Sequence, residues 1–279
     1  MTRLLLSDLD GTLLNKYDVI SDFDAQAIKN WQINNEFMIA SGRYYTDIKH
    51  LLTQAHLNAG MIALNGAIIL DKNYQIINYH SFHQQSLLQQ IITFCEQYQM
   101  IYIVYGLHHV WARFYPHQLI MQLFHLCQKR GTSQSEILQY MQQYYDEIYQ
   151  QFLSINMPFN DFKQDEILHI EIFDHREQLL NKLIEKFGNK LAITTASPVD
   201  LEISPLNISK GMAINELSHH YQQIIAIGDG DNDVTMLQQA DIGIVMVNGS
   251  LKAKQVADQL TVDNNHGGVA KAIMRLLNE

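Results

Sequence analysis

The stretch that decides the fold is LLLSDLDGTL, residues 4–13, near the start of the chain. Three consecutive apolar residues (4–6) are typical of a buried strand in a parallel sheet, and Asp8 and Asp10 follow at once. Parallel sheets place ligand sites at the carboxyl ends of their strands, where these aspartates fall. Residues two apart on an extended chain point to opposite sides, so we expect a turn at Asp10-Gly11 if both carboxylates serve one centre. Taken alone, an Asp-Gly turn is also common in ordinary loops.

In the N-terminal and C-terminal parts of the chain, short apolar runs alternate with longer amphipathic stretches, which is the pattern of β-α-β units. The runs that predict strands are residues 37–40, 61–64, 67–70, 76–79, 224–227 and 242–247. The stretches that predict helices are residues 21–34 and 44–55, and those that begin near Ser209, Asn232, Ser250 and Gly268. The sequence therefore predicts an α/β fold with a Rossmann-like, doubly wound parallel-sheet core.

The middle of the chain differs in composition, because it is rich in Gln, Tyr and His. Residues 138–152 carry apolar side chains at helical spacing, which favours an amphipathic helix over a low-complexity segment. The other predicted elements of this part are helices over residues 84–98 and 177–187 and strands over residues 100–105, 110–113, 167–173 and 191–195. We therefore expect a core formed by residues 1–82 and 199–279, and an inserted α+β domain over residues 83–198.

A second acidic segment, GDGDND at residues 228–233, also follows an apolar run and precedes a predicted helix. Carboxylate and amide oxygens crowded into five positions repel one another unless a cation lies among them, and such hard ligands favour Mg²⁺. A calcium loop that starts at Asp229 is excluded because Val234 and Ala240 stand where Gly and Glu are needed. A dinucleotide-binding GxGxxG is excluded because Asp233 replaces its third glycine. A solvated acidic turn that caps a helix remains the alternative.

Two further segments carry weaker signals. Ser41 and Gly42 follow a predicted strand, where a hydroxyl and backbone N–H groups at a helix start are suited to an anion. Lys210 stands at the start of a predicted helix, where its charge opposes the helix dipole, so a role other than helix stability is indicated. A plain helix cap at Ser41 and a surface lysine at position 210 remain the alternatives.

Composition excludes some classes of binding partner and indicates the cellular compartment. Lys and Arg number 19 against 29 Asp and Glu, giving a net charge of −10, which argues against nucleic acid or an anionic membrane as the main partner. The two cysteines, Cys95 and Cys127, exclude a disulfide framework and a CxxC site. The sequence has no apolar run long enough for a membrane span and no signal-peptide pattern. We expect a cytoplasmic protein without a membrane partner.

In their order, these segments resemble the motifs of the haloacid dehalogenase-like hydrolases. Asp8-x-Asp10-Gly11-Thr12 looks like the first motif of that superfamily, Ser41 the second, Lys210 the third and residues 228–233 the fourth. The Cof-like branch (type IIB, with an inserted α/β cap) is matched by Asn65-Gly66-Ala67, Ser209-Lys210-Gly211, Asn232-Asp233-x-x-Met236-Leu237, Asn248, Asn264 and Gly267-Gly268-Val269. The chain departs from the pattern at Ser41, where many members have Thr, and at Asn248-Gly249-Ser250, where Asn-Ala is common.

The resemblance implies a Mg²⁺-dependent phosphatase that hydrolyses small phosphate monoesters. Asp8 would be the nucleophile that forms an aspartyl-phosphate, and Asp10 the general acid and then the general base. The metal would be held by Asp8, the backbone carbonyl of Asp10 and Asp229, with Asp233 beside it. The expected phosphate-binding residues are Ser41, Gly42, Lys210 and Asn232.

Two other functions stay open on the sequence alone. A phosphomutase of the same superfamily keeps both aspartates of the first motif. A catalytically silent regulatory or binding protein on the same fold would be expected to lose the nucleophile or a metal carboxylate, yet Asp8, Asp10, Asp229 and Asp233 are all present.

The resemblance also implies that the inserted domain sets substrate specificity. The residues we single out there are Tyr102, Tyr105, His108, His109, Trp111, Arg113 and His169. Members of this branch act on hexose, other sugar and polyol phosphates and on phosphorylated cofactors. We expect a small phosphorylated metabolite as the partner, and a monomer or a homodimer.

Overall fold

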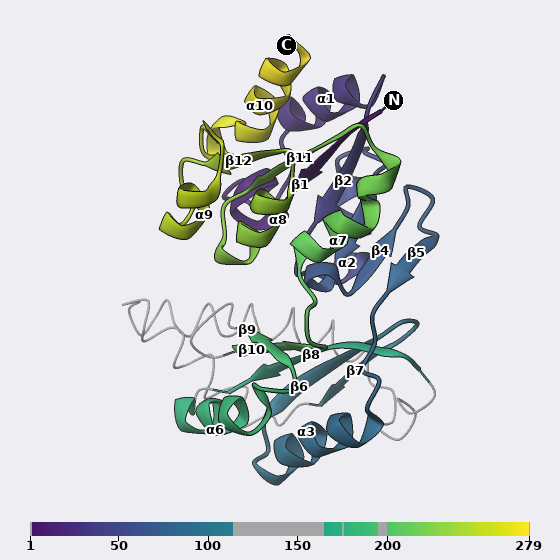
Figure 1. The fold of residues 1–279 in the computed structure, drawn as a ribbon, viewed down its shortest axis with the longest axis vertical. Coiled ribbons are helices and arrows are strands. Elements are labelled where there is room, and N and C mark those ends of the chain that lie inside the picture. The colour runs from purple at the N-terminus through teal and green to yellow at the C-terminus, as the bar shows by residue number, and fades with distance from the viewer. Residues whose placement is uncertain (1, 114–164, 175, 195–199, 279) are drawn as a thin grey trace. The chain divides into compact units, whose positions relative to one another are not determined.

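The computed structural model describes residues 2–113, 165–174, 176–194 and 200–278. The chain divides into two units (Figure 1). The core unit comprises Met1–His80 and Asn207–Glu279, and the inserted unit comprises Ser81–Leu206. The predicted helix over residues 138–152 lies outside the described residues. The role of the inserted unit as a specificity cap stays a prediction.

The core unit is built on an eight-stranded sheet in the order β13-β12-β11-β1-β2-β3-β4-β5. Six strands run parallel: β1 (Arg3–Ser7), β2 (Glu36–Ala40), β3 (Gly60–Ala63), β11 (Gln223–Gly228), β12 (Ile242–Met246) and β13 (Gln259–Thr261). β4 (Ile68–Leu70) and β5 (Ile76–Tyr79) add an antiparallel edge. The middle strands are apolar along their length because both of their faces are buried: Leu4, Leu5 and Leu6 are all fully buried.

Helices cover this sheet. The helices of the core unit are α1 (Asp22–Trp31), α2 (Tyr45–Gln54), α7 (Lys210–Leu217), α8 (Val234–Gln239), α9 (Leu251–Val256) and α10 (Gly268–Leu277). Side chains of α7, α8 and α9 pack on the face that carries Leu4 and Leu6. α1 and α10 lie side by side (Figure 1), and the buried carboxylate of Asp24 in α1 accepts a hydrogen bond from Ala270 N at 2.9 Å. The first and last helices are thereby joined through one buried carboxylate.

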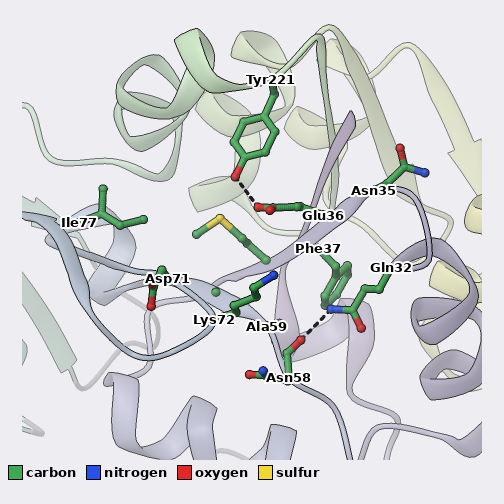
Figure 2. A pocket seen from close by; sticks show the side chains of 12 residues that line it. Gln32, Asn35, Glu36, Phe37, Asn58, Ala59, Asp71, Lys72, Ile77 and Tyr221 are labelled. Carbon is green, nitrogen blue, oxygen red and sulfur yellow. Dashed lines mark hydrogen bonds between the residues drawn. The ribbon is translucent and has the colours of Figure 1, made fainter. Parts of the chain in front are cut away.

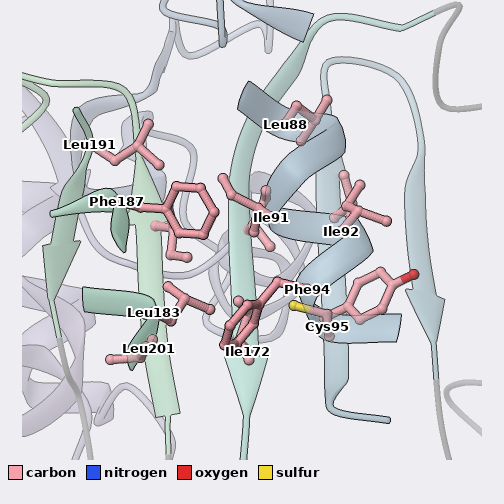
Figure 3. Packing of buried hydrophobic residues seen from close by; sticks show 14 of the residues in the cluster. Leu88, Ile91, Ile92, Phe94, Cys95, Ile172, Leu183, Phe187, Leu191 and Leu201 are labelled. Atoms are coloured by element: carbon pink, nitrogen blue, oxygen red, sulfur yellow. The ribbon is translucent and has the colours of Figure 1, made fainter. Parts of the chain in front are cut away.

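The inserted unit carries a separate five-stranded antiparallel sheet in the order β7-β6-β8-β10-β9. Its strands are β6 (Ile101–Gly106), β7 (Val110–Arg113), β8 (Ile167–Phe173), β9 (Ala192–Thr194) and β10 (Asp200–Ser204), and its described helices are α3 (Gln85–Gln97) and α6 (Glu177–Phe187). Apolar side chains of both helices pack on one face of this sheet, with Ile91 and Phe187 near the centre (Figure 3). Alternate residues of β10, Leu201 and Ile203, belong to this apolar cluster, as expected when one face of a strand packs on helices.

The α/β prediction for the chain is confirmed, with a mostly parallel sheet in the core unit and a separate antiparallel sheet in the insertion. Two strands were not predicted, β10 and the three-residue edge strand β13. α1 ends at Trp31, earlier than the predicted end at Asn34. No helix in the described part of the chain is long and apolar enough to cross a membrane.

Several of the residues singled out in the insertion prove to be internal. Tyr102 and Trp111 belong to the apolar cluster under the helices, and the Tyr102 hydroxyl donates to Glu96 Oε1 at 2.6 Å. His169 is buried, with its Nδ1 2.8 Å from Ser204 Oγ. His108 and His109 are exposed. Packing therefore accounts for Tyr102 and Trp111.

The buried imidazole of His169 predicts an acid-sensitive inserted unit. Burial lowers the pKa of His169 to about 4, from an ordinary value near 6.5. The unfolded state then binds more protons than the folded state, so the stabilisation is complete above about pH 6.5 and is lost as the pH falls towards 4. Between pH 7 and pH 5 the unit should lose about 2 kcal/mol of unfolding free energy through this residue.

Urea unfolding at the two pH values measures this loss. In a Trp31→Phe background only Trp111 remains, so its fluorescence reports on the inserted unit. His169→Gln should flatten the pH dependence, and His108→Gln, a change at an exposed histidine of the same unit, should leave it intact. An equal pH dependence in all three proteins would contradict the prediction.

Candidate active site

The pairing of β1 with β11 brings the two acidic segments together. In the parallel register Ser7 lies opposite Ile227, and the N–H of Asp8 donates to Ile227 O at 2.9 Å. Asp8 and Asp229 therefore leave the sheet at the same edge, although 221 positions separate them in the sequence (229 − 8). The close approach requires glycine at position 11, where φ is +79° and a Cβ atom would collide with the Asp229 carboxylate.

Lys210 is the first residue of α7, and it points into the protein. Its side chain is 0% exposed, and Nζ donates to Asp8 Oδ1 at 2.7 Å and to Asp233 Oδ1 at 2.7 Å. Ser209 caps the helix by accepting from Met212 N at 3.1 Å. A buried ammonium costs several kcal/mol unless it is paired, so the two carboxylates explain how a lysine is tolerated at this position.

Asp233 organises the loop that follows β11. Its Oδ2 accepts hydrogen bonds from the N–H groups of Asp229 at 2.9 Å and Gly230 at 2.8 Å, and its other oxygen is bound by Lys210. Both oxygens of this fully buried carboxylate thus have protein donors. Asp233 is therefore suited to hold the loop and the lysine, and to reach a cation through water rather than directly.

Asp229 is held by a residue to which the sequence reading gave no role. The Thr12 hydroxyl donates to Asp229 Oδ1 at 2.7 Å, which leaves Oδ2 for another partner. Burial raises the pKa of Asp229, against the effect of the Thr12 hydrogen bond. Thr12 belongs to the first motif, but its partner Asp229 could be identified only from the structure, which places the loop after β1 beside the loop after β11.

The cluster has an excess of negative charge. One carboxylate oxygen each from Asp8, Asp229 and Asp233 lies within 4.8 Å of the others. Burial, together with the charge of Asp233, raises the pKa of Asp8 to about 8. Burial lowers the pKa of Lys210, but the charges of Asp233 and Asp8 outweigh this effect and raise it overall. Three carboxylates face one ammonium, so this donor set fits a divalent cation that is bound by oxygen ligands.

Asp10 lies apart from this cluster. Its carboxylate accepts from Arg43 Nε at 2.8 Å and from Arg43 Nη2 at 2.5 Å, and its side chain is 54% exposed. The turn predicted at Asp10-Gly11 is present, because the backbone is extended at Asp10 and left-handed at Gly11. The turn thus sends Asp8 inward to Lys210 and Asp10 outward to Arg43.

The remaining predicted site residues lie on neighbouring loops. Ser41 and Gly42 directly follow β2, and the Ser41 hydroxyl accepts from Arg43 N at 3.2 Å. A Cβ atom at Gly42 would lie 3.2 Å from the Asn65 amide, and Asn65 Oδ1 accepts from Asn232 Nδ2 at 3.3 Å. The loop after β2 and the acidic loop are therefore linked through Asn65. No hydrogen bond from Ser41 or Asn232 to Asp8 is recorded among the described residues, and phosphate binding by these side chains stays a prediction.

Asn248 fixes the turn of the first motif. Its Nδ2 donates to Gly11 O at 2.8 Å, and Ser250 N donates to Asp229 O at 2.8 Å. Asp231 faces outward to Lys252 Nζ at 2.6 Å and to Ser250 Oγ at 2.7 Å. The loop after β12 thus supports both acidic segments from outside.

A separate pocket of about 240 Å³ lies at the opposite edge of the core sheet, around the starts of β2 and β3 (Figure 2). In this pocket Glu36 accepts from the Tyr221 hydroxyl at 2.7 Å, and Gln32 donates to Asn58 O at 2.7 Å. Glu36 and Gln32 thus have partners within the protein. The cluster of Asp8, Asp229 and Asp233 is therefore the stronger candidate for an active site.

Comparison with known proteins agrees with this geometry. A family model described as haloacid dehalogenase-like hydrolase matches residues 5–273. Over 276 residues the chain is 25% identical to the 5-amino-6-(5-phospho-D-ribitylamino)uracil phosphatase YcsE of Bacillus subtilis, covering 97% of this chain and 94% of that protein. It is 29% identical over 296 residues to YwtE, which is also named a 5-amino-6-(5-phospho-D-ribitylamino)uracil phosphatase of Bacillus subtilis. The match covers 99% of this chain and 98% of that protein.

A solved haloacid dehalogenase-like hydrolase from Bacillus subtilis has the same fold. The two structures superpose with a TM-score of 0.76 at 21% identity, covering 98% of this chain and 99% of the other.

The acidic cluster predicts that a divalent cation stabilises the protein. Millimolar MgCl₂ should raise the melting temperature in differential scanning calorimetry, and EDTA should reverse the rise, because the cation binds the folded state. Asp229→Asn removes one charge of the cluster and should abolish most of the rise. Asp231→Asn is the matched control, since Asp231 lies on the same loop but outside the cluster. A rise that survives in Asp229→Asn would place the cation elsewhere.

The raised pKa of Asp8 gives this stabilisation a pH dependence. Below about pH 8 the metal-free cluster holds a proton that must leave when a cation binds, so binding weakens as the pH falls. The rise in melting temperature produced by MgCl₂ should therefore be larger at pH 9 than at pH 6. An equal rise at both values would show that the cluster binds no proton in this range.

Proposed function

Since the chain belongs to the haloacid dehalogenase-like hydrolases, Cof-like type IIB, and is a phosphatase of that family, we propose that it hydrolyses small phosphate monoesters through an aspartyl-phosphate on Asp8. The observation that carries this proposal is the buried contact between Lys210 Nζ and Asp8 Oδ1. The ammonium fixes the direction of the carboxylate and favours its ionised form, which opposes the burial that raises the pKa of Asp8.

The first step transfers the phosphoryl group to Asp8. A carboxylate oxygen of Asp8 attacks phosphorus, and the bond from phosphorus to the ester oxygen breaks with its electron pair remaining on that oxygen. Lys210 has three N–H donors, of which two are directed to Asp8 and Asp233, and we assign the third to a phosphoryl oxygen. Ser41, Gly42 and Asn232 are the further groups we assign to phosphate binding.

Mg²⁺ is the cofactor that we propose for this site. Asp8, Asp229 and the backbone carbonyl of Asp10 would hold it, with Asp233 beside it. When bound, it offsets the repulsion between the phosphate and the Asp8 carboxylate. The protein supplies the orientation: Thr12 fixes Asp229, and Asn248 fixes the turn at Gly11.

Asp10 is the group that we assign to proton transfer. In the first step it donates a proton to the departing ester oxygen, and in the second it accepts a proton from the water that attacks the phosphorus of the aspartyl-phosphate. Asp10 is bound by Arg43 and not by Lys210, so the two carboxylates have separate donors, which suits two separate roles. The two aspartates of the first motif thereby act in different ways.

The substrate class follows from the relatives. Two of them act on the phosphate ester of a ribityl chain, as their names state, at 25% and 29% identity. We propose a phosphorylated metabolite of similar size, either a sugar or polyol phosphate or a phosphorylated cofactor. A screen of such esters, ranked by kcat/KM and repeated without Mg²⁺, tests the class directly.

The proposed roles predict two different losses of activity. Asp8→Asn should abolish turnover of an aryl phosphate with Mg²⁺, because the amide is not a nucleophile. Asp10→Asn should slow it by about 100- to 10,000-fold, the usual contribution of a general acid or base. Asp231→Asn should retain wild-type activity. Phosphate release by the purified proteins measures all three, and near-wild-type activity in Asp8→Asn or Asp10→Asn would refute the assignment.

A further inference from the structure

Each of the four aspartates at the candidate active site has a defined hydrogen-bond donor. Lys210 binds Asp8 and Asp233, and Thr12 binds Asp229. The donor to Asp10 is Arg43, to which neither the sequence reading nor the proposed mechanism gives a role. The other three aspartates are buried or partly buried, whereas the Asp10 side chain is 54% exposed. Asp10 is thus the carboxylate whose direction depends least on the surrounding packing.

The contact has the geometry of a fork. Arg43 Nε donates to Oδ2 at 2.8 Å and Nη2 donates to Oδ1 at 2.5 Å, so two parallel hydrogen bonds fix the plane of the carboxylate. A guanidinium is planar and rigid, and it therefore sets orientation as well as charge. A lysine at this position would supply the charge without the fork.

The backbone holds Arg43 in place. Its N–H donates to Ser41 Oγ at 3.2 Å, and its carbonyl accepts from Leu64 N at 3.1 Å. The guanidinium therefore extends from an anchored loop at the end of β2, while Asp10 extends from the end of β1. Since these strands pair in parallel, the distance between the two loops is set by the sheet.

We propose that Arg43 is a positioning residue that directs the Asp10 carboxyl group at the ester oxygen of the substrate. The proposal rests on the proposed phosphatase function. The proton moves from Asp10 to the ester oxygen as the bond to phosphorus breaks, and Asp10 later takes a proton from water, so each catalytic cycle restores it. The fork uses one acceptor site on each carboxylate oxygen and leaves the other for the proton.

Two substrates with different leaving groups distinguish this positioning role from other roles of Arg43. Phenol is a weak acid, with a pKa of about 10, so its release from phenyl phosphate depends on a proton from the enzyme. 2,4-Dinitrophenolate leaves without a proton. A residue that acts through Asp10 affects the first substrate, whereas a residue that binds the phosphoryl group or supports the fold affects both equally.

The experiment measures the release of phenol or dinitrophenol in the first turnover by stopped-flow absorbance, and compares the rates between variants and between the two substrates. The first turnover is used because its rate does not depend on the later hydrolysis of the aspartyl-phosphate. Arg43→Gln should slow release from phenyl phosphate by about 100-fold, as expected for a misplaced catalytic group, and should change release from 2,4-dinitrophenyl phosphate by less than about threefold. Arg43→Lys should recover part of the loss. Asp10→Asn should show the same selectivity between substrates.

Arg3→Gln is the matched control, because Arg3 lies in the same unit but donates to Leu276 O, away from the candidate active site. It should leave the ratio of the two rates unchanged. Equal slowing of both substrates in Arg43→Gln, or no slowing of either, would overturn the positioning role. Failure of the wild-type protein to release either phenol would instead overturn the proposed function itself.

Discussion

The structure depends on one buried ammonium group, Lys210 Nζ, which lies between the carboxylates of Asp8 and Asp233. These residues come from three separated parts of the chain, and the lysine holds their buried side chains together. Removing one partner of a buried ion pair typically costs about 3–5 kcal/mol, because the remaining charge is left unpaired. In the proposed mechanism the same contact also directs Asp8 as the nucleophile, so one interaction would serve both the stability of the loops and the chemistry of the site.

The parallel sheet is what makes this contact possible. β1, β2 and β11 end at the same edge, so the loops that follow them meet whatever their separation in the sequence. Glycine at position 11 allows Asp229 to approach the first loop, and Asp233 binds the backbone of its own loop through two N–H groups. The result is a set of side chains whose orientations are fixed before any ligand binds, which is the arrangement that electrostatic catalysis requires.

Much of this was predictable from the sequence, for identifiable reasons. The apolar runs before Asp8 and Asp229 predicted two buried strands, and the edge rule for parallel sheets then placed both acidic segments at one edge. The family resemblance is confirmed by a family model that spans residues 5–273. β13 was missed because it has three residues at a partly exposed edge, and β10 because only two of its five residues, Leu201 and Ile203, are apolar.

The partners of Asp229, Asp10 and Gly11 could not be predicted. Thr12, Arg43 and Asn248 carry no periodic signal, and each acquires a role only when a distant loop is placed beside it. The sequence predicted that Asp8 and Asp10 serve one centre in different ways, but it did not predict that each has its own donor, Lys210 and Arg43.

Chemical trapping of the phosphorylated protein tests the central claim most directly. Protein mixed with substrate and Mg²⁺ is quenched in acid within the first turnover and treated with borohydride, which reduces an aspartyl-phosphate to homoserine. Peptide mass spectrometry then locates the modified residue. Homoserine is expected at position 8. Homoserine at another aspartate, or none in an enzyme that is turning over, would contradict it.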